Sequence, residues 1–204
     1  MKLSEVESKE LLKPKFFVCG VNGVGKDTVI KAAQALHPEV RTMVASSALR
    51  NYLRTDYEGL RNCPHNLALA ALGEIVRSFI KVTYRNDIFM FNAHVLNLVC
   101  GQRKEVVGDW LGMFDAMVLV TADPEVIFDR LFCGCRKRAL FVFGQSIMER
   151  LTMFKDYARD YEVRFHELAR QYDRPAFRLV NDGTPQEAGR ALLEVHAHFS
   201  NGAR

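Results

Sequence analysis

The chain has 204 residues, of which 49% are hydrophobic and 25% are charged, and its formal net charge is +4. This composition is typical of a soluble globular protein with a substantial core, and the modest positive charge suits anionic ligands. A nucleic-acid partner is not expected because a denser basic patch would be needed. No run approaches the roughly 18 apolar residues of a membrane span, and no apolar signal segment opens the chain, so we expect a cytoplasmic protein without a membrane partner.

The chain is expected to form a polar leader, residues 1–14, and a single domain, residues 15–204, because no repeat or flexible linker interrupts it. Five short apolar runs predict strands that are covered by helices on both faces. These runs span residues 15–20, 40–45, 105–109, 116–122 and 176–181.

Helical patterns separate the predicted strands. Asp123 is a candidate N-cap with Pro124 in the first helical position, and Thr184 is a second candidate cap. The helices are predicted over residues 27–36, 65–85, 92–102, 123–132, 146–172 and 184–199. Strands that alternate with helices predict an α/β fold with a parallel sheet, whose ligands bind at the carboxyl ends of the strands.

The string GVNGVGKDT, residues 20–28, lies between the first predicted strand and the first predicted helix. Gly20, Gly25 and Lys26 satisfy the pattern G-x-x-x-x-G-K, in which backbone amides, a helix N-terminus and one ammonium group hold a polyphosphate. We therefore expect ATP to bind through Gly20, Val21, Asn22, Gly23, Val24, Gly25, Lys26, Asp27 and Thr28.

Asp27 stands where such loops usually carry a hydroxyl, and a hydroxyl appears one place later at Thr28. A carboxylate at this place repels phosphate unless it faces Mg²⁺ or the water shell of the ion, or caps the first turn of the helix. The sequence leaves both functions of Asp27 open. Thr28 is the better candidate for a hydroxyl near the phosphates.

The GKDT string resembles the small P-loop kinases of nucleoside monophosphates, some of which carry aspartate after the lysine. The strand-helix segment TADPEVIFDRL and the ending Asn181-Asp182-Gly183 before a helix resemble the compact archaeal-type adenylate kinases. This resemblance implies a three-layer P-loop NTPase fold with a five-stranded parallel sheet, and ATP and Mg²⁺ as cofactors. It also implies an acceptor region at about 46–100 and an arginine-rich lid at about 130–145.

Several further residues are candidates for phosphate transfer. Asp109 ends a predicted strand, where P-loop enzymes place a carboxylate that holds the Mg²⁺ shell or contacts the acceptor; a turn or cap aspartate is the alternative. Arg130, Arg136 and Arg138 belong to the candidate lid and could neutralise charge during transfer as catalytic residues, unless the segment is a solvated basic loop.

Two candidates concern the substrates. Arg50 follows the second predicted strand, where related kinases hold the acceptor phosphate with an arginine; a surface charge is the alternative. Asn181 stands in the segment that wraps the donor base in the same family, although an ordinary strand-to-helix turn is equally compatible. The five cysteines are scattered, and reduced thiols are expected for them, including the Cys133–Cys135 pair.

The sequence favours an ATP- and Mg²⁺-dependent kinase of a nucleoside or deoxynucleoside monophosphate, with a small-molecule phosphate acceptor as its partner. One alternative is the same phosphotransferase acting on a non-nucleotide metabolite. Another is an ATP-binding switch or ATPase, which has no need of an acceptor pocket. The segment GDWLGMFD, residues 108–115, does not match the acceptor signature of adenylate kinases, so the base of the acceptor is not assigned.

Overall fold

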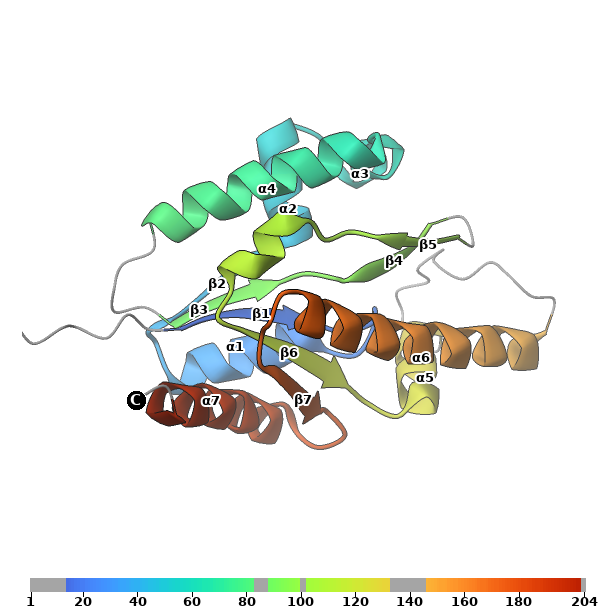
Figure 1. Ribbon diagram of the computed structural model, residues 1–204. Helices are drawn as coiled ribbons and strands as arrows, with labels where there is room; N and C mark the ends of the chain where they lie inside the picture. Colours follow the sequence, from blue (N-terminus) through green and yellow to red (C-terminus); the bar gives the residue numbers. More distant parts are fainter. Residues whose placement is uncertain (1–13, 83–87, 100–101, 133–145, 203–204) are drawn as a thin grey trace, which may run out of the picture.

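Five parallel strands form the central sheet, and helices alternate with them along the chain (Figure 1). The computed structural model describes residues 14–82, 88–99, 102–132 and 146–202. The spatial order β2-β3-β1-β6-β7 places the first strand in the middle, as in a doubly wound sheet. The strands are β1 (Lys15–Cys19), β2 (Val40–Val44), β3 (Ile88–Asn92), β6 (Ala116–Thr121) and β7 (Ala176–Val180). The predicted α/β fold with a five-stranded parallel sheet is confirmed.

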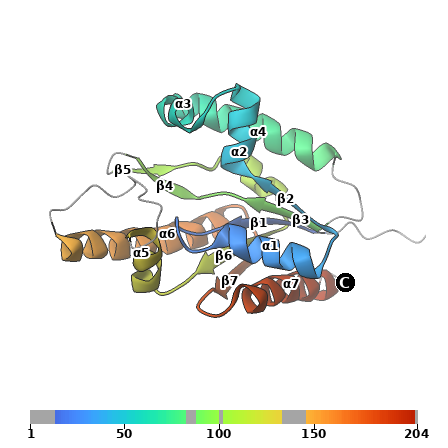
Figure 2. The ribbon, with the colours of Figure 1, turned by 180° about the vertical axis from the view of Figure 1, so that it is seen from behind.

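Helices cover both faces of this sheet (Figures 1 and 2). On one face α1 (Lys26–Leu36) packs against α7 (Pro185–Gly202), while α6 (Ile147–Gln171) crosses the other face. The helix α5 (Pro124–Phe132) follows β6 and packs against α6. Among the described residues, no helix combines the length and the apolar character needed to cross a bilayer.

A group of helices lies between β2 and β3, where the sequence predicts the acceptor region. It consists of α2 (Ala45–Leu53), α3 (Tyr57–Asn62) and α4 (His65–Val82), which gather beyond the β2 edge of the sheet in both views (Figures 1 and 2). The predicted helix 65–85 is therefore present over its described part. The candidate lid residues Arg136 and Arg138, the pair Cys133–Cys135 and most of the leader lie outside the described residues.

The third strand of the sheet is not the predicted one. The sequence predicts a strand over 105–109 and a helix over 92–102, and both predictions are wrong. The third strand is β3, whose five residues IFMFN are all buried, whereas EVVGD has too few apolar residues to be covered on both faces. Residues 96–105 form an antiparallel hairpin of β4 (Leu96–Val99) and β5 (Gln102–Glu105), and a 3₁₀ helix, η1 (Asp109–Met113), follows it.

An aromatic cluster explains why η1 lies over the sheet. Phe17 on β1, Phe91 on β3, Trp110 on η1 and Phe114 just after it have ring centroids 5.4–6.2 Å apart. All four side chains are at most 3% exposed, so their burial supplies much of the free energy that holds η1 in place.

Candidate nucleotide site

The loop 20–25 connects β1 to α1 at the carboxyl edge of the sheet. Gly23 and Gly25 have φ of 84° and 94°, in the left-handed region that glycine adopts without strain. A Cβ on Gly23 would lie 2.7 Å from Cγ of Leu131, and one on Gly25 would lie 2.6 Å from Nδ2 of Asn181. Any larger residue at these two places would collide with the side chains of Leu131 and Asn181, which pack against the loop. The segment is therefore restricted to the bare backbone that is typical of phosphate-binding loops.

Lys26 begins α1 and is folded onto the loop. Its Nζ donates hydrogen bonds to the carbonyl oxygens of Gly20, at 2.7 Å, and Val21, at 3.3 Å, and the residue is only 8% exposed. A charge-assisted contact with a polyphosphate oxygen is stronger than a contact with a neutral carbonyl oxygen. The position of Lys26 therefore suits an anion seated in the loop.

Asp27 lies in the first turn of α1 and is exposed, next to the exposed Thr28. One oxygen of its carboxylate accepts a hydrogen bond from Nδ2 of Asn92, the last residue of β3. Its hydrogen bond thus goes to the end of the neighbouring strand rather than to an amide of its own helix. Asn92 is 4% exposed and is not singled out from the sequence, because residues 92–102 are predicted to form a helix. A polar residue at the end of the buried run IFMFN is the signal that could have identified it.

Asn181, a predicted cofactor-binding residue, holds the loop from the other side. Its Nδ2 donates to the carbonyl of Val24 at 2.7 Å, and its backbone amide donates to the carbonyl of Thr121, also at 2.7 Å. Its own carbonyl oxygen accepts from Nη2 of Arg130 at 3.5 Å. The side chain of Asn181 therefore supports the loop 20–25, and its contact with a donor base stays a prediction.

Tyr161 on α6 supports the loop in a way that the sequence did not predict. Its hydroxyl oxygen accepts backbone hydrogen bonds from Gly20, at 3.0 Å, and from Val95, at 2.9 Å. Burial raises the pKa of Tyr161 well above its ordinary value, and burial also raises the pKa of the neighbouring Cys19 thiol. One turn earlier, Tyr157 donates to the carbonyl of Leu96 at 2.9 Å. Tyrosines four positions apart on an amphipathic helix usually indicate core packing. The sequence therefore gives no sign that the hydroxyl of Tyr161 supports the loop 20–25.

Arg50, the predicted acceptor residue, is a partly buried cation on α2. Its guanidinium carbon lies 3.8 Å from the ring centroid of Tyr57, and its Nη2 donates to Oγ of Ser47 at 3.5 Å. Its Nε is buried and makes no hydrogen bond. A guanidinium fixed on an aromatic face keeps donors that suit a phosphate or carboxylate.

Asp109 does not end a strand of the sheet, so the reason for placing it in the metal shell is lost. It opens η1 and is exposed. Its charge adds to burial in raising the pKa of Tyr172, at the C-terminal end of α6. A groove of about 460 Å³ contains Asp109 between α2, α4 and η1, with Tyr52, Leu53, Leu67, Gly73, Arg77 and Trp110 in its wall.

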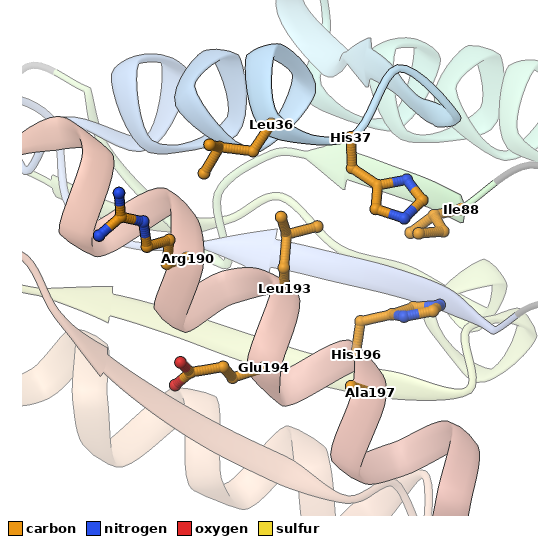
Figure 3. Close-up of a pocket in the computed structure, with 8 residues that line it drawn as sticks. All are labelled: Leu36, His37, Ile88, Arg190, Leu193, Glu194, His196 and Ala197. Atoms are coloured by element: carbon orange, nitrogen blue, oxygen red, sulfur yellow. The ribbon is translucent and has the colours of Figure 1, made fainter.

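A second groove of about 460 Å³ lies between the C-terminal end of α1 and α7 (Figure 3). Ile88 begins β3 and His37 is the C-cap residue that follows α1, so this groove is at the amino edge of the sheet, away from the loop 20–25. Its wall consists of Leu36, His37, Ile88, Arg190, Leu193, Glu194, His196 and Ala197, and it is largely apolar. The loop 20–25, where the sequence predicts nucleotide binding, lies at the other edge of the sheet.

The residues of the loop fit ATP and Mg²⁺. The loop supplies a glycine backbone and a buried lysine for phosphates, and Asp27 and Thr28 supply oxygen atoms beside them. In the described part of the chain, no group of three or more His, Cys, Asp or Glu side chains is placed to hold a metal ion. Mg²⁺ bound together with phosphates needs only one or two carboxylates and keeps several waters, so the donor set suffices.

Comparison with solved structures finds a similar fold in proteins described as shikimate kinases and a gluconokinase. The chain is similar to a shikimate kinase from Acinetobacter baumannii in complex with shikimate, with a TM-score of 0.63 and 11% identity over 92% of this chain and 95% of that one. It is also similar to the Aquifex aeolicus shikimate kinase (TM-score 0.56, 10% identity, 90% and 96% covered). A gluconokinase from Sinorhizobium meliloti has a TM-score of 0.52 at 15% identity, with 94% and 96% covered.

No protein-family model and no curated protein sequence matches the chain. At identities of 10% to 15%, the similarity to solved structures establishes the shared fold and nothing finer.

Proposed function

We propose that the protein is an ATP-dependent phosphotransferase that transfers a phosphoryl group to a small molecule. The observation that carries this proposal is the glycine loop with Lys26 folded over it at the carboxyl edge of the sheet. The kinase fold of the similar structures supports the same conclusion. The resemblance to monophosphate kinases favours a nucleoside or deoxynucleoside monophosphate as the acceptor.

Arg50 is the proposed contact to an anionic group of the acceptor. The residue belongs to the first helix after β2, and stacking on Tyr57 limits the freedom of its side chain. A bidentate guanidinium suits phosphate, which favours a phosphorylated acceptor over a neutral one.

The second candidate function is a kinase of a non-nucleotide metabolite. Two similar structures are described as shikimate kinase in complex with shikimate and as gluconokinase, names that point to hydroxylated carboxylates. Arg50 also suits a carboxylate, so the contact alone does not separate the two acceptors. An acceptor screen that includes nucleoside monophosphates and hydroxylated carboxylates separates these two possibilities.

In this proposal the side chains act mainly by positioning and charge. Lys26 exchanges its bonds to the loop carbonyls for donor phosphate oxygens, and Arg130, together with Arg136 and Arg138, neutralises the transferring group. Asp27 and Thr28 hold the Mg²⁺ shell, and Asn181 adjoins the donor base. Mg²⁺ bound with ATP neutralises charge on the phosphates during transfer. No covalent intermediate is required, because orientation lowers most of the barrier.

The first test is Lys26→Met, with Lys31→Met as the matched control because Lys31 is an exposed lysine on the same helix. ATP affinity is measured by calorimetry, and ADP formation is followed with a panel of nucleoside monophosphates and hydroxylated carboxylates. We expect a loss of about 10- to 1,000-fold in kcat/KM for Lys26→Met and almost none for Lys31→Met. Unchanged ATP affinity in Lys26→Met would remove the basis of the proposal.

A second test separates a nucleoside monophosphate kinase from an ATP-binding switch. A dinucleoside polyphosphate that links donor and acceptor nucleotides should bind a monophosphate kinase more tightly than ATP does, because it fills both sites. Arg50→Met should weaken that ligand and raise KM for the acceptor, with Arg61→Met, an exposed arginine of α3, as control. A switch would bind ATP alone and would tolerate the loss of Arg50.

A further inference from the structure

Asp27 and Asn92 form a contact that joins the phosphate loop to the middle of the sheet. Asn92 ends β3 and is paired on both sides, with Val18 of β1 and Val44 of β2 as its partners in register. The next amide, that of Ala93, donates to the carbonyl of Val18 at 3.1 Å. The backbone of Asn92 is therefore fixed at the carboxyl edge, and its side chain reaches Asp27 from a rigid position.

The chemistry of the two side chains sets the direction of this contact. An ionised carboxylate only accepts hydrogen bonds, so the amide nitrogen of Asn92 must be the donor. This bond occupies one oxygen of Asp27, while the carboxylate remains exposed to solvent. The buried Asn92 thus orients a carboxylate whose other oxygen is available to a hydrated cation.

P-loop NTPases usually hold Mg²⁺ with a hydroxyl from the loop and a carboxylate from a neighbouring strand. In this chain the two places are exchanged: the carboxylate, Asp27, is on the helix, and the strand ends in a neutral hydrogen-bond donor, Asn92. Only one carboxylate is present at the contact in either arrangement. Two would repel each other and the phosphates.

We propose that Asn92 is the positioning residue for Asp27, and that the pair performs the metal-shell function from exchanged places. This inference rests on the proposed ATP site and adds to it a residue outside the loop motif. It also accounts for the unusual GKDT string: the aspartate after the lysine is compensated by the absence of an acid at the end of β3.

The test measures the dissociation constant of ATP in EDTA and with excess Mg²⁺. The readout is the ratio of the first constant to the second, which is the factor by which Mg²⁺ tightens ATP binding. In Asp27→Asn this ratio should fall by about 10- to 100-fold. If the wild-type ratio is itself smaller than that, the ratio of the variant should fall to one. Asn92→Asp should weaken ATP binding in EDTA, since it adds a second carboxylate. The double variant Asp27→Asn, Asn92→Asp returns the carboxylate to the contact and should restore the ratio.

Asp173→Asn is the matched control, because Asp173 is an exposed aspartate in a turn after α6 with φ of 51°, which asparagine also adopts. It should keep the wild-type ratio. Thermal unfolding is recorded for every variant. Where the Asn92→Asp proteins do not fold, Asn92→Ala takes their place and should lower the ratio about tenfold.

Three results overturn the inference: a wild-type ratio of one, an unchanged ratio in Asp27→Asn, or a folded double variant that stays at the level of Asp27→Asn. For Asn92→Ala, an unchanged ratio does the same. Failure of the proposed function is distinct from these, since it appears as no ATP binding by the wild type or as full ATP affinity in Lys26→Met.

Discussion

The side-chain amide of Asn181 donates a hydrogen bond to the carbonyl oxygen of Val24 at 2.7 Å, across 157 positions of sequence. The same side chain stands 2.6 Å from the place that a Cβ on Gly25 would take. Asn181 follows β7, whereas Val24 belongs to the loop after β1, so the last strand of the sheet sets the shape of the first loop.

Replacement of Asn181 by aspartate should therefore weaken ATP binding. A carboxylate there faces the Val24 carbonyl with no proton to share and adds negative charge beside the phosphates. We expect a loss of ATP affinity of at least about tenfold, which corresponds to about 1.4 kcal/mol. Calorimetric titration with ATP measures it, with Asp182→Asn as a control for the neighbouring exposed position. Equal affinities for Asn181→Asp and the wild type would show that the loop keeps its shape without this bond.

Tyr161→Phe should lower stability by removing an acceptor that two buried amides share. The amides of Gly20 and Val95 would each lose their bond to the hydroxyl, at a cost of about 1–3 kcal/mol for each unsatisfied donor. Chemical denaturation should show a loss of about 2–6 kcal/mol in the free energy of unfolding. Tyr52→Phe, at an exposed tyrosine, should stay within about 0.5 kcal/mol. Similar values for the two variants would contradict the importance of the hydroxyl.

The buried thiol and phenols should make the protein sensitive to alkaline pH. Burial raises the pKa of Cys19 and Tyr161 above their ordinary values of 9.0 and 10.0, so the unfolded chain loses these protons first. The contribution of these groups to the free energy of unfolding is therefore fully present below about pH 9. It falls as the pH rises, by up to about 1.4 kcal/mol per pH unit for each group. Denaturation curves from pH 8 to pH 11 should show a shallower decline above pH 10 in Tyr161→Phe. An unchanged slope would mean that Tyr161 ionises as easily when folded.

Local sequence patterns were sufficient for the loop, for four of the five strands of the sheet and for the long helices. The glycines with Lys26 sit between a buried strand and a helix, as predicted, and the long amphipathic patterns became α4 and α6. These signals lie within one element or at one junction, where hydrophobic period and capping residues determine the conformation. The parallel sheet followed from the alternation of strands with helices.

The support of the site could not be predicted in this way, because its contacts are distant in sequence. Asn92 lies 65 positions from Asp27, and Tyr161 lies 141 positions from Gly20. The two valines of 105–109 and the acid that follows them also resemble a strand that ends in a metal ligand. The local pattern therefore favours Asp109 over Asn92 as the residue that ends the third strand. Only the structure distinguishes EVVGD from IFMFN, because IFMFN pairs with both β1 and β2 and all five of its residues are buried.

Alanine substitutions at Gly189 and Gly73 should have opposite effects on stability, because the two glycines differ in how closely other atoms pack against them. Both are buried helical glycines, in α7 and α4, and alanine is favoured over glycine in a helix by about 1 kcal/mol. A Cβ on Gly189 would lie 2.8 Å from Cβ of Ala32 and from the backbone nitrogen of Ala33, so α1 and α7 would have to separate. A Cβ on Gly73 would meet its nearest neighbour, Nη1 of Arg77, at an ordinary 3.4 Å.

Gly189→Ala should therefore be destabilising by about 1–3 kcal/mol, since overpacking against a backbone atom outweighs helix propensity. Gly73→Ala should be neutral or stabilising by up to about 1 kcal/mol. Thermal and urea unfolding of the two variants beside the wild type measures the difference. If Gly189→Ala proved as stable as Gly73→Ala, the close approach of α1 and α7 would not be required, and the helix behind the phosphate loop would be free to shift.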